Sequence, residues 1–275
     1  MFLRKAVPLF AVLTFTLTSG LAFAGSKAAT IIGGSTVAAS DPDAASTVAI
    51  VIQLQGGQAI CTGSLLAADI LVTAAHCVTD ESGKTVSAKQ LRLVFATDVR
   101  STSRKLVNAT GVKRHPNYDG DGGGKDQNDI AIIRFAGGIP SGYQKATLLG
   151  SDTPISKGSA AVLIGYGVNT MAGGGSGSGT LRKVTATVAD GQFAKTEVLI
   201  DQRNGKGACH GDSGGPAFAR SGGRLLLWGV TNRGDPVNAP DDCKQFSVYT
   251  RITSQASFIN SAARTLRGSS SLARR

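Results

Sequence analysis

Short runs of apolar residues alternate with polar and glycine-rich segments from residue 46 onward, and this pattern predicts β-strands. The first run, 46–54, leads through Gly56 and Gly57 into a second run at 58–66 and a third at 70–74. Runs of this length that are bounded by turn residues are typical of hairpins. Further strands are predicted at 91–96, 129–135, 160–164, 181–188, 196–200, 225–231 and 247–252. Their regular spacing indicates β-barrels.

Two glycine-rich stretches and one helix complete this pattern. The ranges 120–124 and 173–179 offer no side chains to a core, so we expect surface loops there. A helix is predicted at 254–266, where apolar residues recur at helical spacing around Ile259. The last residues, 267–275, are expected to form a frayed basic tail.

The first 24 residues are organised like a secretory signal peptide. Arg4 and Lys5 precede an apolar stretch at 6–17, and small residues follow up to Ala24. A membrane anchor is the alternative, but threonine, serine and glycine interrupt the run well short of the roughly 20 apolar residues that a span needs. We therefore expect cleavage after residue 24 and export to an extracellular or periplasmic compartment, with no membrane span later in the chain.

Composition favours a folded β protein. The chain has 275 residues, of which 41% are hydrophobic and only 5% aromatic, and its 36 glycines favour short strands and turns over packed helices. In an oxidising compartment its four cysteines fit two disulfides, with three pairings open. Zinc is the competing use, but no two cysteines form a close pair of the kind that binds zinc, so we expect no metal. The cysteines are Cys61, Cys77, Cys209 and Cys243.

The chain is basic. Its net charge is +11, and loss of Arg4, Lys5 and Lys27 with the leader, without any acid, would leave +8. These cations are dispersed and do not alternate with aromatic residues, so we interpret them as a solvated basic surface and expect no nucleic-acid partner.

One serine lies in a run that favours nucleophilic chemistry. Ser213 stands within Gly211 to Pro216, but a serine hydroxyl attacks at neutral pH only with a neighbouring base and a buried acid to orient that base. His76 follows an apolar strand and precedes a cysteine that could fix its position. Asp129 lies at the mouth of an apolar run, where a carboxylate is costly to bury unless a group such as a histidine Nδ1–H binds it. We expect Ser213, His76 and Asp129 to act together.

Taken in order, several runs resemble the chymotrypsin/trypsin-like serine peptidase family. They are Ile31 to Gly34, Thr73 to Cys77, His115 to Tyr118, Gly165 to Gly167, Gly211 to Pro216 and Val248 to Thr250. The resemblance implies two six-stranded antiparallel β-barrels packed face to face, at about 31–140 and 141–252, within a peptidase domain at 31–266. The active site would lie between the barrels. It also implies a secreted serine endopeptidase that needs no cofactor, is a monomer, and has protein or peptide substrates and proteinaceous inhibitors as partners.

The resemblance also assigns roles to backbone groups and to a new N-terminus. The N–H groups of Gly211 and Ser213 would form the oxyanion hole. Asp212 would pair with the amine of Ile31 once a propeptide at 25–30 is removed, so we expect a zymogen. Because the bond to be cut follows a threonine, a trypsin-like activator is not indicated, and the activating protease stays unknown.

The resemblance pairs Cys61 with Cys77 and Cys209 with Cys243. The first disulfide would close a loop of about 15 residues, which stabilises the fold by roughly 3 kcal/mol, and it would hold His76 in place.

The substrate pocket is where the chain departs from the family pattern. The pocket positions are Gly207, Ala208, Asn232, Arg233, Gly234 and Ser247. Gly207, six residues before the nucleophile, brings no carboxylate to the pocket floor, so preference for Arg or Lys is disfavoured. Asn232 replaces a serine that contacts the catalytic acid, and Arg233 replaces an aromatic residue that lines the substrate path. We expect a medium or large apolar residue before the cut bond.

Two other function classes compete with the peptidase interpretation. A catalytically silent family member that acts as a binding or adhesion module is the alternative that Asn232 and Arg233 keep open. A secreted esterase of the α/β-hydrolase type would need a Gly-x-Ser-x-Gly elbow and the order Ser, Asp, His, which this chain lacks. Among other residues, His210 is interpreted as a cleft-rim residue, His115 as a loop residue, and Asn108 as a match to a glycosylation acceptor.

Overall fold

In a computed structural model of the chain, the structure describes residues 31–120, 124–150, 153, 155–235 and 243–272. The signal peptide predicted at 1–24 and the propeptide predicted at 25–30 lie outside the described residues. None of the helices in the described ranges is long and apolar enough to cross a membrane.

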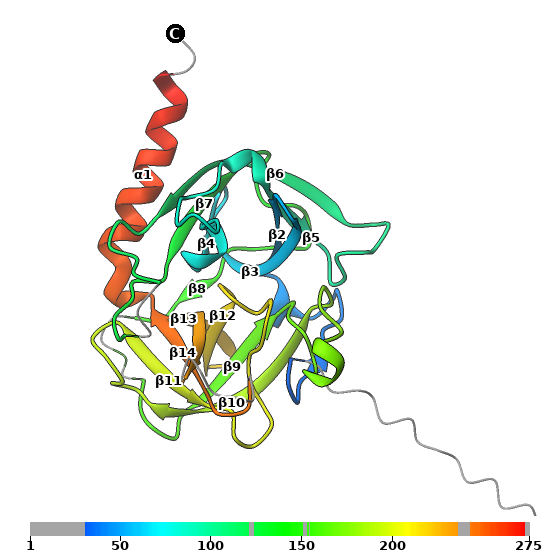
Figure 1. Ribbon diagram of the computed structural model, residues 1–275, viewed down its shortest axis with the longest axis vertical. Coiled ribbons are helices and arrows are strands. Elements are labelled where there is room, and N and C mark those ends of the chain that lie inside the picture. Colours follow the sequence, from blue (N-terminus) through cyan, green and yellow to red (C-terminus); the bar gives the residue numbers. More distant parts are fainter. Residues whose placement is uncertain (1–30, 121–123, 151–152, 154, 236–242, 273–275) are drawn as a thin grey trace, which may run out of the picture.

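Six strands from the first half of the chain close into an antiparallel barrel (Figure 1). In order around the barrel they are β2 (Thr47–Leu54), β3 (Gly57–Ala67), β4 (Ile70–Thr73), β7 (Ala131–Phe135), β6 (Lys105–Arg114) and β5 (Leu91–Phe95). In β5, Leu91 and Leu93 are buried while Arg92 between them is exposed, which is the alternation that a strand with one solvated face requires.

Six strands from the second half close into another antiparallel barrel. In order they are β9 (Ala160–Gly165), β10 (Arg182–Asp190), β11 (Glu197–Asp201), β14 (Phe246–Arg251), β13 (Arg224–Asp235) and β12 (Pro216–Ser221). Two short strands extend this sheet: β1 (Ser35–Thr36) beside β10, and β8 (Thr147–Leu148) parallel to β13. The two predicted barrels are thereby confirmed.

Alternate side chains of the second barrel serve two different cores. Leu163 and Trp228 belong to a cluster inside the second barrel. Their neighbours Val162 and Leu227 belong to the larger cluster, which also contains the core of the first barrel. Successive residues of a strand point to opposite faces. Each of these strands therefore contributes side chains to the core of its own barrel on one face and to the contact between the barrels on the other. The barrels therefore pack face to face on a shared apolar layer.

The C-terminal helix α1 (Ala256–Leu272) packs on strands β6 and β7 of the first barrel (Figure 1). Leu266 fits against Gly111, where an added Cβ would lie only 2.8 Å from a leucine methyl group. The prediction that the helix ends at residue 266 and a frayed tail begins at 267 is wrong, because α1 continues to Leu272. Arg267 is held in this extension by Asp69, with nitrogen and oxygen 2.6 Å apart. Short 3-10 helices lie at Pro42–Ala44, His76–Val78, Ala88–Gln90, Ala172–Gly174 and Thr253–Gln255.

Two strands of the barrels, β6 and β12, were not predicted, whereas the other ten agree with the predicted ranges to within a few residues. The predicted loop at 173–179 contains the end of a 3-10 turn and one isolated β-bridge, at Ser176. Part of the other predicted loop, 121–123, lies outside the described residues.

Candidate active site

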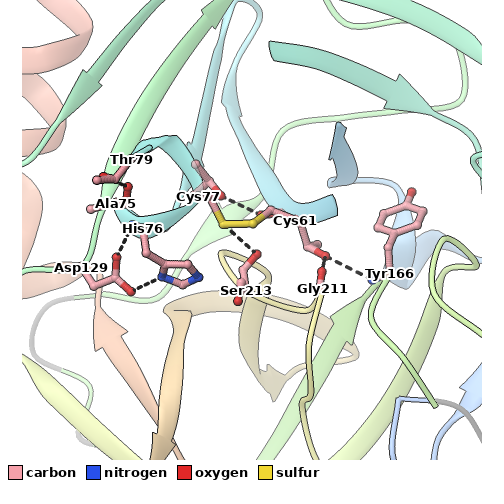
Figure 2. Close-up of a disulfide and its surroundings, with 11 residues drawn as sticks. Cys61, Ala75, His76, Cys77, Thr79, Asp129, Tyr166, Gly211 and Ser213 are labelled. Carbon is pink, nitrogen blue, oxygen red and sulfur yellow. Dashed lines mark hydrogen bonds and ion pairs between the residues drawn. A yellow bond between two sulfur atoms is a disulfide. The ribbon is translucent and has the colours of Figure 1, made fainter. Parts of the chain in front are cut away.

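His76 begins a 3-10 turn (His76–Val78) shortly after the end of β4 at Thr73. The next residue, Cys77, forms a disulfide with Cys61 of β3, as the resemblance implied. The disulfide fixes the turn to the neighbouring strand (Figure 2). The imidazole is therefore carried by a short, cross-linked element with little freedom to move.

Asp129 lies just before β7, and not within it as predicted, and its carboxylate binds His76 at two points. Oδ1 accepts a hydrogen bond from the backbone N–H of His76 at 2.9 Å, and Oδ2 lies 2.8 Å from Nδ1 of the imidazole. Asp129 is 1% exposed, whereas the His76 side chain is 33% exposed. The carboxylate is thus buried behind the ring, and the ring faces the surface between the barrels.

This arrangement sets the protonation behaviour of His76. Burial of the imidazole by itself would lower its pKa, but the negative charge of Asp129 and the hydrogen bond outweigh this effect. The pKa of His76 is therefore raised above its usual value of 6.5. With Nδ1–H directed at Asp129, the neutral ring keeps its Nε2 lone pair for another group.

Ser213 lies on the side of the His76 ring away from Asp129, so that the imidazole stands between the two residues (Figure 2). Its backbone is fixed to the first barrel, because Ser213 O accepts a hydrogen bond from Thr62 N at 2.8 Å. It is also fixed to the second barrel through Gly214, whose N–H donates to Thr231 O at 2.8 Å. The structure therefore brings together the three residues that the sequence predicted to act together.

The glycines on either side of Ser213 are required by the backbone. Gly211 has a φ of 95° and Gly214 a φ of 77°, a region that side chains other than glycine rarely adopt. A Cβ at Gly211 would lie 2.9 Å from Gly167 Cα, and one at Gly214 would lie 2.0 Å from Thr73 Oγ1. The loop that carries Ser213 can therefore take this path only with glycine at both positions.

Asp212, the residue before Ser213, is buried and is 1% exposed. Its carboxylate accepts hydrogen bonds from Gly167 N at 2.8 Å and Cys209 N at 2.9 Å. Burial nevertheless raises the pKa of Asp212 from 3.8 to about 7, against the lowering effect of these donors. The charge of Arg182 also lowers this pKa, but burial outweighs it, so a new positive charge nearby would further favour the ionised carboxylate.

The segment that begins at Ile31 lies beside this loop. Ile31 is completely buried, and Ile32 forms an antiparallel bridge with Gly207, whose N–H donates to Ile32 O at 3.0 Å. The bridge brings Ile31 next to Ala208, one residue before the Cys209 N–H that binds Asp212. Residues 31 and 32 are therefore held against the segment 207–208, which leads into this loop.

At the predicted pocket floor, the space beside Gly207 is filled by a residue that the sequence analysis missed. A Cβ at Gly207 would lie 2.2 Å from the Gln202 amide carbon and amide oxygen. Gln202 is 1% exposed, and its amide binds the backbone of Ala208, with Oε1 accepting from N at 2.7 Å and Nε2 donating to O at 3.1 Å. The second disulfide, Cys209–Cys243, flanks this floor. The side chain beside Gly207 is therefore an uncharged amide whose groups are engaged internally.

Two other predicted pocket residues are neighbours across strands. Gly234 of β13 pairs with Ser247 of β14 in the antiparallel register. A bulge in β13 between Thr231 and Arg233 leaves Asn232 out of this pairing. The Asn232 side chain donates to a buried glutamate, Glu197, and to Thr250 Oγ1, at 3.3 and 3.4 Å.

Glu197 is the second residue that the sequence analysis missed. It is completely buried at the start of β11 and binds the Arg233 guanidinium through both oxygens, at 2.8 and 3.0 Å. The charge of Arg233 is therefore paired with a buried carboxylate. A cavity of about 240 Å³ lies beside this pair. Its lining residues are His76, Tyr118, Gly120, Gln127, Asp129, Asn232 and Arg233.

The remaining histidines lie apart from this arrangement. His210 is exposed next to Gly211. His115 follows β6 and stacks edge-on against Phe258 of α1, with ring centroids 4.7 Å apart. The two groupings of cysteine with histidine in the described chain each contain a disulfide, so their sulfur atoms are not free thiolates for a metal.

Two closed six-stranded antiparallel barrels followed by one C-terminal helix are the chymotrypsin-like fold. A family model described as Trypsin matches residues 31–259 of the chain. The chain therefore belongs to the trypsin family, and it carries a trypsin-family serine protease domain.

Individual relatives agree with this assignment. The chain is 32% identical over 194 residues to Trypsin alpha-4 of Lucilia cuprina, across 65% of this chain and 71% of the relative. It is 30% identical over 228 residues to Trypsin Blo t 3 of Blomia tropicalis, across 76% and 79%. It is 28% identical over 213 residues to Trypsin of Sus scrofa, across 72% and 84%.

Proposed function

We propose that the chain is a serine endopeptidase that hydrolyses peptide bonds through an acyl-enzyme on Ser213. The observation that carries the proposal is the His76 ring, which is bound at Nδ1 by the buried Asp129 carboxylate and faces Ser213 on its other side (Figure 2). Membership of the trypsin family supports the same activity.

In the proposed mechanism, Nε2 of neutral His76 takes the proton from the Ser213 hydroxyl as its oxygen attacks the scissile carbonyl. The ring then gives this proton to the leaving amine, and a water molecule repeats the sequence to release the acyl group. Asp129 keeps the proton on Nδ1 and stabilises the imidazolium ion that forms. The raised pKa of His76 is consistent with this stabilisation, because it reports how strongly the carboxylate favours the charged ring.

The N–H groups of Gly211 and Ser213 are the proposed oxyanion hole. The positive φ of Gly211 supports this role, because it gives the backbone at this position a conformation that residues other than glycine rarely adopt. Loss of one such donor typically costs about 3 kcal/mol of transition-state stabilisation.

We further propose that the chain is made with a signal peptide at 1–24, exported, and activated by removal of residues 25–30. The two disulfides are consistent with an oxidising compartment. The buried Asp212, whose pKa is about 7, is the proposed partner of the Ile31 amine that this cleavage would release. N-terminal sequencing of the active form tests the idea, and full activity of a chain that starts at Gly25 would contradict it.

The pocket supports cleavage after medium or large apolar residues. The two residues described at its predicted floor are Gly207 and Gln202, whose amide is bonded internally, and neither offers a carboxylate to bind Arg or Lys. A cleavage profile on a peptide library checks this preference. A profile dominated by Arg or Lys would overturn it.

Labelling with an active-site fluorophosphonate tests the activity itself. We expect the processed protein to be labelled at Ser213, and we expect Ser213→Ala to abolish labelling and peptide hydrolysis. Ser82→Ala is the matched control, because this serine lies in an exposed loop of the first barrel. Absence of labelling that depends on Ser213 would instead support a binding or adhesion module.

A further inference from the structure

The buried ion pair between Glu197 and Arg233 lies at the boundary of the two barrels. Glu197 is completely buried and the Arg233 side chain is 12% exposed. Both carboxylate oxygens bind the guanidinium, at 2.8 and 3.0 Å. A pair that is buried to this extent persists only with good geometry and additional hydrogen bonds, so its further partners show what it holds.

These further partners belong to the first barrel. Glu197 Oε1 accepts a hydrogen bond from Gln127 N at 3.2 Å, and Arg233 Nη2 donates to Gly124 O at 2.9 Å. Both bonds reach backbone atoms, so they fix the path of the segment 124–127. This segment ends two residues before Asp129, which makes the ion pair a tie between the second barrel and the approach to the proposed catalytic acid.

A second route connects Glu197 to Asp129 itself. Thr250 Oγ1 donates to the backbone oxygen of Asp129 at 3.1 Å. Asn232 Nδ2 lies 3.4 Å from that hydroxyl and donates to Glu197 Oε1 at 3.3 Å. Contacts that lead back to Glu197 therefore hold Asp129 at two places. One is the segment that precedes Asp129, and the other is the carbonyl oxygen of Asp129 itself.

The segment needs this support because its backbone is unusual. Asp126 and Asn128 have φ values of 59° and 54°, and Gln127 lies between them. Residues other than glycine keep such conformations only where surrounding contacts determine them. Asp126 Oδ1 adds two hydrogen bonds, which it accepts from the N–H and the hydroxyl of Thr196, both at 2.7 Å.

We propose that Glu197 and Arg233 are positioning residues for the catalytic acid. Their ion pair fixes segment 124–128 against the second barrel and so holds Asp129 in the orientation that binds His76. Arg233 accordingly serves the acid from inside the protein, and its charge is not offered to the substrate. This inference rests on the proposed serine-peptidase function.

The test uses the processed enzyme and phenylmethanesulfonyl fluoride, a reagent too small to depend on distant substrate contacts. Glu197→Gln removes the charge of the carboxylate. Asp98→Asn is the matched control, because it removes the charge of a carboxylate that forms an exposed ion pair with Arg100. The double variant Glu197→Met/Arg233→Met replaces the pair by apolar chains, a change that buried pairs often tolerate without loss of stability. Melting temperatures separate folding from positioning.

We expect the inactivation rate of the double variant to fall about 100-fold, as for a catalytic group displaced by about 1 Å, while it remains folded. Asp98→Asn should react like the wild type. For the double variant, kcat should fall by the same factor on an ester with one residue before the bond and on a peptide with four. An unchanged inactivation rate in a folded double variant would overturn the inference, and so would a loss confined to KM of the longer substrate.

The failure of the proposed function is distinguishable from the failure of this inference. If wild-type protein does not react at Ser213, the serine-peptidase proposal fails. If the wild type reacts and the folded double variant reacts equally fast, only the positioning role of Glu197 and Arg233 fails.

Discussion

The buried carboxyl group of Asp212 should make the unprocessed chain less stable as the pH rises from 4 to 7. In the folded protein its pKa is about 7, compared with the reference value of 3.8. Between these two values the folded state keeps the proton and the unfolded state releases it. The contribution of the protonated Asp212 carboxyl group to the free energy of unfolding is therefore fully present below pH 4. It is lost as the pH rises through the pKa of this group in the folded protein.

The expected magnitude follows from the difference between the two pKa values. Each pKa unit corresponds to about 1.4 kcal/mol. Relative to a neutral isostere, the carboxyl group should therefore lower the free energy of unfolding by about 2 kcal/mol at pH 5.5 and about 4 kcal/mol at pH 7. Asp212→Asn supplies the isostere, because an amide cannot ionise and occupies nearly the same volume.

The assay is urea unfolding of chain 25–275 at pH 4, 5.5 and 7, with and without Asp212→Asn. Both proteins carry Ser213→Ala to prevent self-cleavage. We expect the asparagine variant to become relatively more stable as the pH rises. In chains that start at Ile31, the released amine should pair with the carboxylate and reverse this trend. A stability difference that stays constant between pH 4 and 7 in the unprocessed chain would refute the reasoning.

Three further predictions concern the same site. Asp129→Asn should lower kcat about 10⁴-fold, as expected for a misoriented imidazole. In the pH–rate profile of this variant, the acid limb should lie at lower pH than in the wild type, because the charge that raises the pKa of His76 is gone. Gly214→Ala should destabilise the fold by about 1–3 kcal/mol in denaturant unfolding and abolish serine labelling, since its φ is 77° and the space for a Cβ is filled. Cys61→Ala/Cys77→Ala should lower the free energy of unfolding by about 3 kcal/mol, and equal stability would contradict the loop-closure estimate.

Most of the fold could be predicted from the sequence because its strands are short apolar runs bounded by turns. β6 was missed because only Val107 and Ala109 of its ten residues are buried, so its periodicity is weak. β12 was missed because it follows the Ser213 run at once and begins with Pro216, where turn residues conceal the start of a strand. The end of α1 was missed because Arg267 resembles a tail residue until its contact with Asp69 is seen.

The proposed triad could be predicted because each member stands in a short run with its own chemical signal. Glu197 and Gln202 gave no such signal. Glu197 is the first of two acids in the run Glu-Val-Leu-Ile-Asp, which is equally compatible with an exposed strand end. Its importance depends on Arg233, which lies 36 residues away in the sequence. A contact of this kind can be identified only from the folded structure, in which the strands that carry the two residues lie close together.

Two of the departures from the family pattern, Gly207 and Arg233, are each matched by a residue at one end of β11. Glu197 begins the strand and pairs with Arg233, and Gln202 follows its last residue and fills the space beside Gly207. Neither departure can therefore be interpreted alone. Gly207→Asp by itself should not create preference for Arg or Lys, because its Cβ would lie 2.2 Å from the Gln202 amide. Gly207→Asp together with Gln202→Ala should create it, as measured by a shift of peptide-library cleavage toward basic residues; an equal shift in the single variant would show that Gln202 does not occupy the floor.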